Sequence, residues 1–235
     1  MKQTFTSFLI LTLLILFGCS GNYTEIDGKQ KTRMRTLSEF HTLNISGNFE
    51  VTVDANNSQK IEIDANDDVL PFVITEVKNK QLNISTSKDL GKTTFVKLKI
   101  SMKYLKEINA SGISEIVVKN INSDKLTVNI SGASDLVTNG TTDEFVVNVS
   151  GAADLTANGS TDKFVINVSG ASDVHAKNLK SKIVGVNISG AGDILVNAVD
   201  KLNVDISGVG EIKYTGSPSI ISKDISGFGT VSKLE

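Results

Sequence analysis

A column of acidic residues is the feature of this sequence that could most readily do chemistry. Each acid stands three residues after the glycine of a repeated serine-glycine pair, at Glu115, Asp135, Asp154, Asp173, Asp193 and Glu211. If the repeats stack as adjacent strands, neighbouring carboxylates lie about 4.8 Å apart, close to the roughly 5 Å between the carboxyls of a retaining glycosidase. Such a row can also recruit cations, because like charges repel. A third interpretation, which we favour, is that the acids accept hydrogen bonds from corner amides or serines.

Asparagine recurs with the same period, three residues before each glycine. The column comprises Asn109, Asn129, Asn148, Asn167 and Asn187, and aspartate replaces asparagine at Asp205 and Asp224. Amide side chains stacked on parallel strands can hydrogen-bond to one another along the stack. The spacing therefore predicts a structural asparagine ladder rather than a ligand site.

The rest of the sequence offers little for catalysis. The histidines His41 and His175 are far apart, and the only arginines, Arg33 and Arg35, precede the repeats. No set of nucleophile, base and orienting group is discernible. We therefore expect a protein that is not an enzyme, with no catalytic residues, no metal ligands and no cofactor. A carbohydrate-active enzyme of the β-helix type is the alternative from another class.

The elements that must position these columns follow from the repeat itself. Seven serine-glycine pairs recur every 18 to 20 residues from Ser111-Gly112 to Ser226-Gly227, and Ser46-Gly47 stands apart near the start. Apolar residues alternate with others on both sides of each glycine, for example Phe145, Val147 and Val149 before Gly151. Strict alternation marks a strand with one buried face, and a fixed period of this length is typical of a solenoid.

We therefore predict an all-β fold, a parallel β-solenoid with coils of about 19 residues. Each coil should have two short strands that meet at the serine-glycine corner, where glycine supplies backbone freedom for the bend. Polar turn formers such as Asn139-Gly140 should close the coil. The repetitive solenoid should occupy residues 111–235.

The segment 39–110 should cap this solenoid with a smaller antiparallel patch. It contains alternating strand patterns at 49–54, 60–65, 73–78, 81–85 and 95–102, with Asn79-Lys80 as a hairpin turn between two of them. A cap of this kind would protect the open sheet edge of the first coil. At the other end, Lys223 and Thr230 interrupt the apolar and acidic columns and indicate a polar terminal cap.

The first residues have the proportions of a signal peptide. Lys2 precedes an uncharged run from Phe5 to Phe17, which is too short for the roughly 20 residues of a membrane span. The only cysteine, Cys19, follows directly after Leu16-Phe17-Gly18, which resembles the lipobox of bacterial lipoproteins. We predict a signal peptide at 1–18, lipidation of Cys19, and a tether at 19–38 that joins the body to the membrane.

Composition limits the partners. The net charge is −2, and no basic stripe is present, so nucleic acid is not an expected partner. The membrane is the expected partner through the N-terminal lipid. The sequence does not decide whether the protein binds a protein or glycan ligand, or whether it forms a homo-oligomer.

Taken together, the chain resembles the head GIN domain family over about residues 37–235. The segment Leu43-Asn44-Ile45-Ser46-Gly47, the strands around Ile74 and Ile84, and the succession of serine-glycine corners carry the resemblance. It implies a β-helix without catalytic residues in an outer-membrane lipoprotein, for which an adhesive role has been proposed. The expected function is a lipid-anchored adhesin or interaction scaffold of the cell envelope. A periplasmic structural or stress-related protein is a further alternative.

Overall fold

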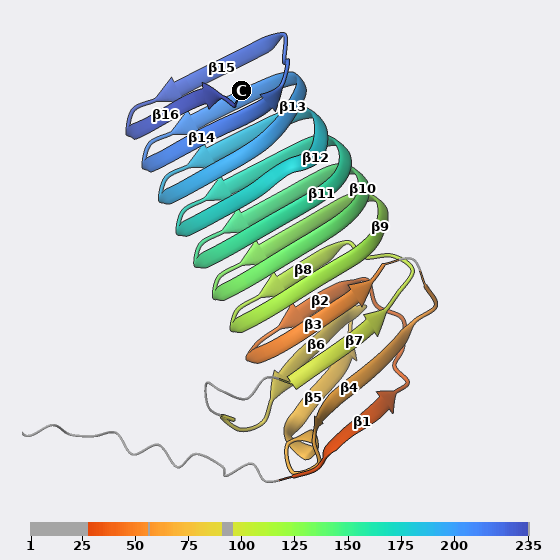
Figure 1. The fold of residues 1–235 in the computed structure, drawn as a ribbon. Coiled ribbons are helices and arrows are strands. Elements are labelled where there is room, and N and C mark those ends of the chain that lie inside the picture. Colours follow the sequence, from red (N-terminus) through yellow and green to blue (C-terminus); the bar gives the residue numbers. More distant parts are fainter. Residues whose placement is uncertain (1–27, 56, 91–95, 235) are drawn as a thin grey trace, which may run out of the picture.

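The computed structural model describes residues 28–55, 57–90 and 96–234. Within these ranges the chain is almost entirely β-structure, with one short 3-10 turn, η1 (Leu70–Phe72). Figure 1 shows an elongated stack of coils that ends at β15 and β16, with the N-terminal strands gathered at the opposite end. No helix in the described part of the chain is long and apolar enough to cross a membrane. The predicted all-β parallel solenoid is confirmed.

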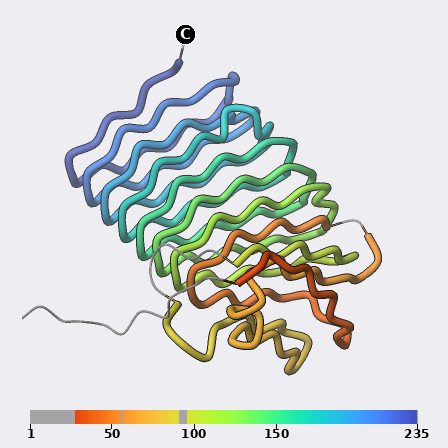
Figure 2. Tube along the Cα trace, turned by 60° about the horizontal axis from the view of Figure 1, so that its bottom comes forward, coloured from red at the N-terminus to blue at the C-terminus, as the bar shows by residue number. Residues whose placement is uncertain are grey.

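Each regular coil is one long strand rather than two short ones. Strand assignment runs unbroken from one serine-glycine pair to the next, in β9 (Ile113–Ile130), β10 (Ala133–Val149), β11 (Ala152–Val168), β12 (Ala171–Ile188) and β13 (Ala191–Ile206). Successive coils pair in parallel and in register, so that Asp135 lies beside Asp154 and Phe145 beside Phe164. The polar turns do not interrupt this pairing, because Asn139 and Gly140 pair with the same positions of the next coil. Each coil turns back at both sides of the stack (Figure 2).

The core is a set of apolar columns between the two arms of the coils. Val147 is fully buried and lies in register between Val128 and Ile166. One column over, the rings of Phe145 and Phe164 stack with their centroids 5.2 Å apart. Dense, identical layers explain why the residues before each glycine alternate so strictly.

Glycine stands at the corners because the coils approach closely. A Cβ atom on Gly151 would lie 2.0 Å from the carbonyl oxygen of Gly132 in the coil below. Among the corner glycines only Gly47 has a positive φ, of 130°. The expected role of backbone freedom is therefore wrong for the regular corners, where the requirement is space between two backbones.

The N-terminal segment builds the first coil as well as a cap. Strands β2 (Thr42–Ile45) and β3 (Asn48–Asp54) enclose the Ser46-Gly47 corner and pair in parallel with β8 (Glu107–Ala110) and β9. The Ser111 amide donates to the Ile45 carbonyl over 2.9 Å, as the corner amides of later coils do. The isolated serine-glycine pair is thus the lowest corner of the solenoid.

Below this coil the sheet becomes mixed. Parallel pairing continues to β6 (Gln81–Thr86) and β7 (Val96–Ser101), and antiparallel pairing adds β5 (Val73–Lys78) to β6 and both β4 (Lys60–Asn66) and β1 (Gln30–Arg35) beyond β7. The predicted antiparallel patch therefore describes only the outer part of the cap. Asn79 and Lys80 form the expected hairpin turn, both with positive φ. Strand β1 also lies inside the segment that we assigned to the tether, so residues 30–35 belong to the folded body.

The C-terminal end has the polar feature predicted for it. Strands β14 (Val209–Gly216), β15 (Ile220–Ile225) and β16 (Phe228–Lys233) form the last coils. Lys223 occupies the apolar column in register with Val204, and its ammonium donates to the Val231 carbonyl over 3.0 Å. A charge that points inward at a sheet edge opposes pairing with further strands.

Candidate binding groove along the asparagine ladder

The asparagine column forms a continuous ladder of side-chain hydrogen bonds. Each Nδ2 donates to the Oδ1 of the asparagine in the coil below, over 2.7 to 2.8 Å, in the series Asn187, Asn167, Asn148, Asn129, Asn109, Asn44 and Asn83. The predicted ladder is confirmed. It extends further down than the repeats did, because Asn44 and Asn83 join it from strands that lie distant in sequence.

The ladder uses half of each amide's hydrogen-bonding capacity. A primary amide has two N–H donors and two acceptor lone pairs. One donor and one lone pair bond to the neighbouring coils. Asn129 and Asn44 donate a second time, to Glu107 and Gln81. At Asn148, Asn167 and Asn187 the second N–H and the second lone pair remain available, so this part of the column presents donors and acceptors once per coil, about 4.8 Å apart.

The serine of each corner lines the same face. Its residue stands two positions after the asparagine, and both side chains point outward from the core because alternate residues of a strand share a face. The hydroxyl of Ser169, for example, donates to the Val149 carbonyl over 3.3 Å and is exposed. Together the two columns line a groove of about 810 Å³ that runs from Asn44 to Ser207.

The groove is neutral along most of its length and acidic at one end. Asp205 follows Asn187 in register, so a carboxylate meets the free Oδ1 end of the ladder. A carboxylate has no proton to donate, and the ladder of amide bonds therefore ends at Asn187. The groove thus has a polarity, with its amide donors directed toward β2 and a negative charge near β15.

A stability experiment can test whether the ladder bonds contribute as drawn. In Asn148→Asp the side chain can still accept from Asn167, but it loses the donor that reaches Asn129. We expect unfolding at pH 7 to require about 1–2 kcal/mol less free energy. The protonated carboxyl restores the donor, so its pKa is raised in the folded state, and the lost stability returns as the pH falls through that pKa.

Equilibrium urea denaturation at pH 7 and pH 4 measures both effects. Asn203→Asp is the matched control, because Asn203 also faces outward but stands outside the ladder. Equal urea midpoints for the two variants at both pH values would contradict the contribution of the ladder.

The acidic column does not form the hydrogen bonds to corner amides and serines that we expected. Its register is as predicted, with Glu115, Asp135, Asp154, Asp173 and Asp193 side by side. Within the described part of the chain, however, no corner amide or serine donates a hydrogen bond to Asp135, Asp154, Asp173 or Asp193. The residues described also contain no group of three or more side chains placed to hold a metal ion. The carboxylates are exposed to solvent and line shallow hollows of the surface, but the linings of these hollows contain no basic residue.

Ion pairs form elsewhere on the coils, at the start of the arm that leads to the groove. Glu144 lies between Lys125 and Lys163, with N–O distances of 2.8 and 2.9 Å. Hydrogen bonds from these two ammonium groups hold the pKa of the Glu144 carboxyl below its usual value. The contribution of this exposed triad to stability is present at neutral pH and is lost as the pH falls through the lowered pKa.

The remaining candidate residues are dispersed. His175 is exposed on the regular coils, whereas His41 directly precedes β2 at the lower end. Arg35 is a structural clamp, since its guanidinium donates to the Thr75 hydroxyl over 2.6 Å and to the Val73 carbonyl over 2.9 Å. Cys19 lies outside the described residues.

The structure adds one feature that sequence reasoning missed. The serines were interpreted as corner formers and the asparagines as a ladder, each by itself. Their two-residue spacing already placed both columns on one face, and this was the signal that could have indicated a groove.

Comparison with known proteins identifies the family. The family described as "Putative auto-transporter adhesin, head GIN domain" matches residues 39–218, and the chain belongs to it. No curated protein matches this chain.

Solved structures share the fold. A "putative adhesin" from Bacteroides fragilis is 26% identical, with a TM-score of 0.82 over 89% of this chain and 99% of its own. A "putative lipid binding protein" from Parabacteroides distasonis is 22% identical, with a TM-score of 0.69 over 89% of this chain and 98% of its own. A "putative adhesin" from the same organism is 20% identical, with a TM-score of 0.67 over 91% of this chain and 100% of its own. The family and these structures bear the names of adhesins or a lipid-binding protein and not of enzymes, which fits a non-catalytic role at the envelope or surface.

Proposed function

We propose that this protein is a lipid-anchored, non-catalytic adhesin-like module of the cell envelope that binds an extended ligand in the asparagine–serine groove. The observation that carries the proposal is the groove of about 810 Å³, along which amide donors and acceptors that are not used by the ladder recur at regular intervals. The resemblance in name and fold to adhesins supports the same role.

The groove favours a ligand with regularly repeated polar groups. Its donors and acceptors recur about every 4.8 Å, whereas side chains on one face of an extended peptide recur about every 6.6–6.8 Å. A peptide lying along the axis would lose register within a few coils. A glycan chain, whose hydroxyl-bearing units repeat on a scale close to the coil spacing, fits the array better.

A pair of variants on either side of one corner tests the groove. Ser169→Gln places a longer side chain in the groove, and Ala171→Gln places the same side chain on the opposite side of Gly170, where Ala171 is also exposed. With immobilised neutral oligosaccharides as probes, we expect Ser169→Gln to abolish the retention that the wild type shows and Ala171→Gln to preserve it. Equal retention of both variants would contradict the proposal that the groove is the binding surface.

The anchor is tested separately at Cys19. In cells that express the full precursor, Cys19→Ala removes the acceptor of the lipid. Several acyl chains, at about 0.8 kcal/mol per buried methylene, hold a protein firmly on a bilayer, so the variant should move from the membrane pellet to the soluble fraction. Detergent partitioning measures this, and continued retention in the membrane phase would contradict the lipid anchor.

Location decides between the adhesin and the periplasmic alternative. Protease treatment of intact cells should remove the protein if the solenoid faces outward, with lysed cells as the control for cleavage. Full protection would favour a periplasmic scaffold. The β-helix enzyme stays a weaker alternative, because the family and the solved structures bear the names of adhesins or a lipid-binding protein and not of enzymes.

A further inference from the structure

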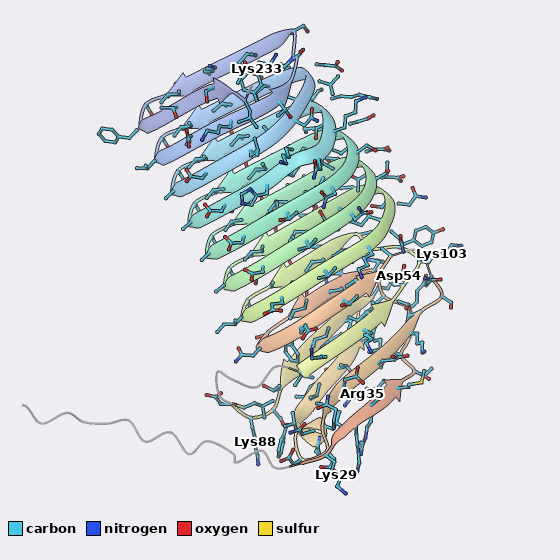
Figure 3. The ribbon with its side chains drawn as sticks, in the orientation of Figure 1. Lys29, Arg35, Asp54, Lys88, Lys103 and Lys233 are labelled. Carbon is cyan, nitrogen blue, oxygen red and sulfur yellow. The ribbon has the colours of Figure 1, made fainter. Side chains whose placement is uncertain are left out.

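A second pocket lies near the lower end of the solenoid, away from the asparagine–serine groove. It has a volume of about 560 Å³, and four segments line it: the chain around His41, the loop at Ser58 and Gln59 before β4, the hairpin turn at Lys80, and residues 103–106 between β7 and β8. We propose that this pocket binds an anionic sugar, such as a sugar acid or a sugar phosphate. Lys103 marks its position in Figure 3, where it lies at the opposite end of the solenoid from Lys233.

Backbone hydrogen bonds hold the floor of the pocket in place. The His41 amide donates to the Lys80 carbonyl over 3.0 Å, and the Lys106 amide donates to the His41 carbonyl over 2.9 Å. Lys80, His41 and Lys106 therefore stand directly before β6, β2 and β8, with β2 between the other two strands. The backbone of Lys80 and the backbone of Lys106 are thus fixed on either side of His41.

A side-chain clamp fixes a further wall. Gln59 donates through Nε2 to the carbonyls of Ser38, over 2.8 Å, and Leu37, over 3.1 Å. Its Oε1 accepts from the Phe40 amide. The segment before β2 is therefore tied to the loop before β4, and the wall is largely formed before any ligand arrives.

The charge of the pocket is positive in a chain whose net charge is negative. The lining contains Lys80, Lys103 and Lys106 against the single carboxylate of Glu39. None of these three lysines forms an ion pair in the described structure, whereas other lysines, such as Lys97 and Lys163, do. Unpaired ammonium groups around a concave surface attract an anion, and lysine serves phosphate and carboxylate as a point charge.

The other groups of the pocket point to a sugar rather than a bare anion. Tyr104 is 55% exposed and presents its ring beside the Lys103 ammonium, which lies 5.3 Å from the ring centroid. An exposed aromatic ring offers an apolar face with a polar hydroxyl, a combination that suits a pyranose. Glu39 and Ser58 add acceptors for hydroxyl groups. This ligand class differs from the neutral polymer proposed for the groove, and neither site requires the other.

The test is titration of the full-length protein with four small probes at low salt. We expect glucuronic acid and glucose 6-phosphate to bind, and to bind more weakly as salt is added, because the attraction is screened. Glucose lacks the charge and should bind at least about fivefold more weakly than the acidic sugars, the factor that one exposed charge pair contributes at contact. Inorganic phosphate lacks the ring and its contact with Tyr104, so it should bind about two- to tenfold more weakly than glucose 6-phosphate.

Variants distinguish the pocket from non-specific attraction. Lys106→Gln should weaken glucuronic acid binding by about fivefold, and Tyr104→Ala should weaken it by about two- to tenfold. Lys180→Gln, at an exposed lysine on the regular coils, should not change it. Unchanged circular dichroism and melting temperature establish that the variants are folded. Phosphate binding as tight as glucose 6-phosphate binding would overturn the sugar part of the proposal. No binding of either acidic sugar, or an equal loss in Lys180→Gln, would overturn the site.

Discussion

Gly170→Ala should destabilise the solenoid severely, by about 3 kcal/mol or more. A Cβ atom at this corner would lie 1.9 Å from the carbonyl oxygen of Gly151 and 2.7 Å from that of Ser150. Both atoms belong to the backbone of the coil below, so no side-chain rotation relieves the contact. The two coils would have to separate, and their separation would lengthen the ladder of parallel hydrogen bonds on both arms.

Gly185→Ala is the matched control for this prediction. The same methyl group at Gly185 would find its nearest neighbour at 4.0 Å, on the side chain of Val165. With space available and less freedom in the unfolded chain, this variant should be neutral or stabilised by up to about 1 kcal/mol. Equilibrium urea unfolding gives both values, and hydrogen exchange should show lost protection concentrated in β11 and β12 for Gly170→Ala. Similar urea midpoints for the two variants would contradict close backbone approach as the reason for glycine at the corners.

Val147→Asp should have an effect of similar size for a different reason. Val147 is fully buried between Val128 and Ile166, and no polar group of the apolar columns could pair with a carboxylate there. An unpaired charge in such a place is among the few changes that cost about 4 kcal/mol or more. Val146→Asp, on the outward and half-buried side of the same strand, should cost only about 1 kcal/mol.

The pH dependence of Val147→Asp adds a second test. Burial raises the pKa of the introduced carboxyl above its unfolded value of about 4. A raised folded-state pKa means that the variant is least destabilised below about pH 4 and loses stability as the pH rises through the raised value. Thermal unfolding of both variants at pH 4 and pH 7 measures this. A deficit of Val147→Asp that does not grow with pH would show that the carboxyl reaches solvent and that the column is not sealed.

The structure shows where local pattern was sufficient and where it was not. The alternation around Phe145, Val147 and Val149 predicted the inward columns correctly, because side-chain direction in a strand depends only on position along the chain. The pairing of Ser46-Gly47 beneath Ser111-Gly112 could not be predicted in the same way. It depends on a contact across more than 60 residues, and the intervening strands had to be placed before the two corners could meet.

The candidate sites differ in the same way, because some follow from the local sequence pattern and others depend on contacts between distant segments. The asparagine ladder was predictable from its period, since equal spacing brings equal side chains together once the strands are in parallel register. The acidic column has the same regular spacing, but its expected hydrogen bonds to corner amides and serines are not formed, because register brings acids beside acids and supplies no donor. The pocket around His41, Lys80 and Lys106 left no repeated signal, because its residues come from separate turns and loops of the irregular cap.

The repeating coil, its buried and exposed faces, and the lipobox-like position of Cys19 could all be recognised from the amino-acid sequence, because each depends only on the types and spacing of residues close together in the chain. The tertiary structure alone decided that the corner glycines are needed for space, that the isolated first corner completes the stack, and that asparagine and serine columns border one continuous groove. These features arise between coils, where the distance from one backbone to the next governs what fits and which polar groups remain unpaired.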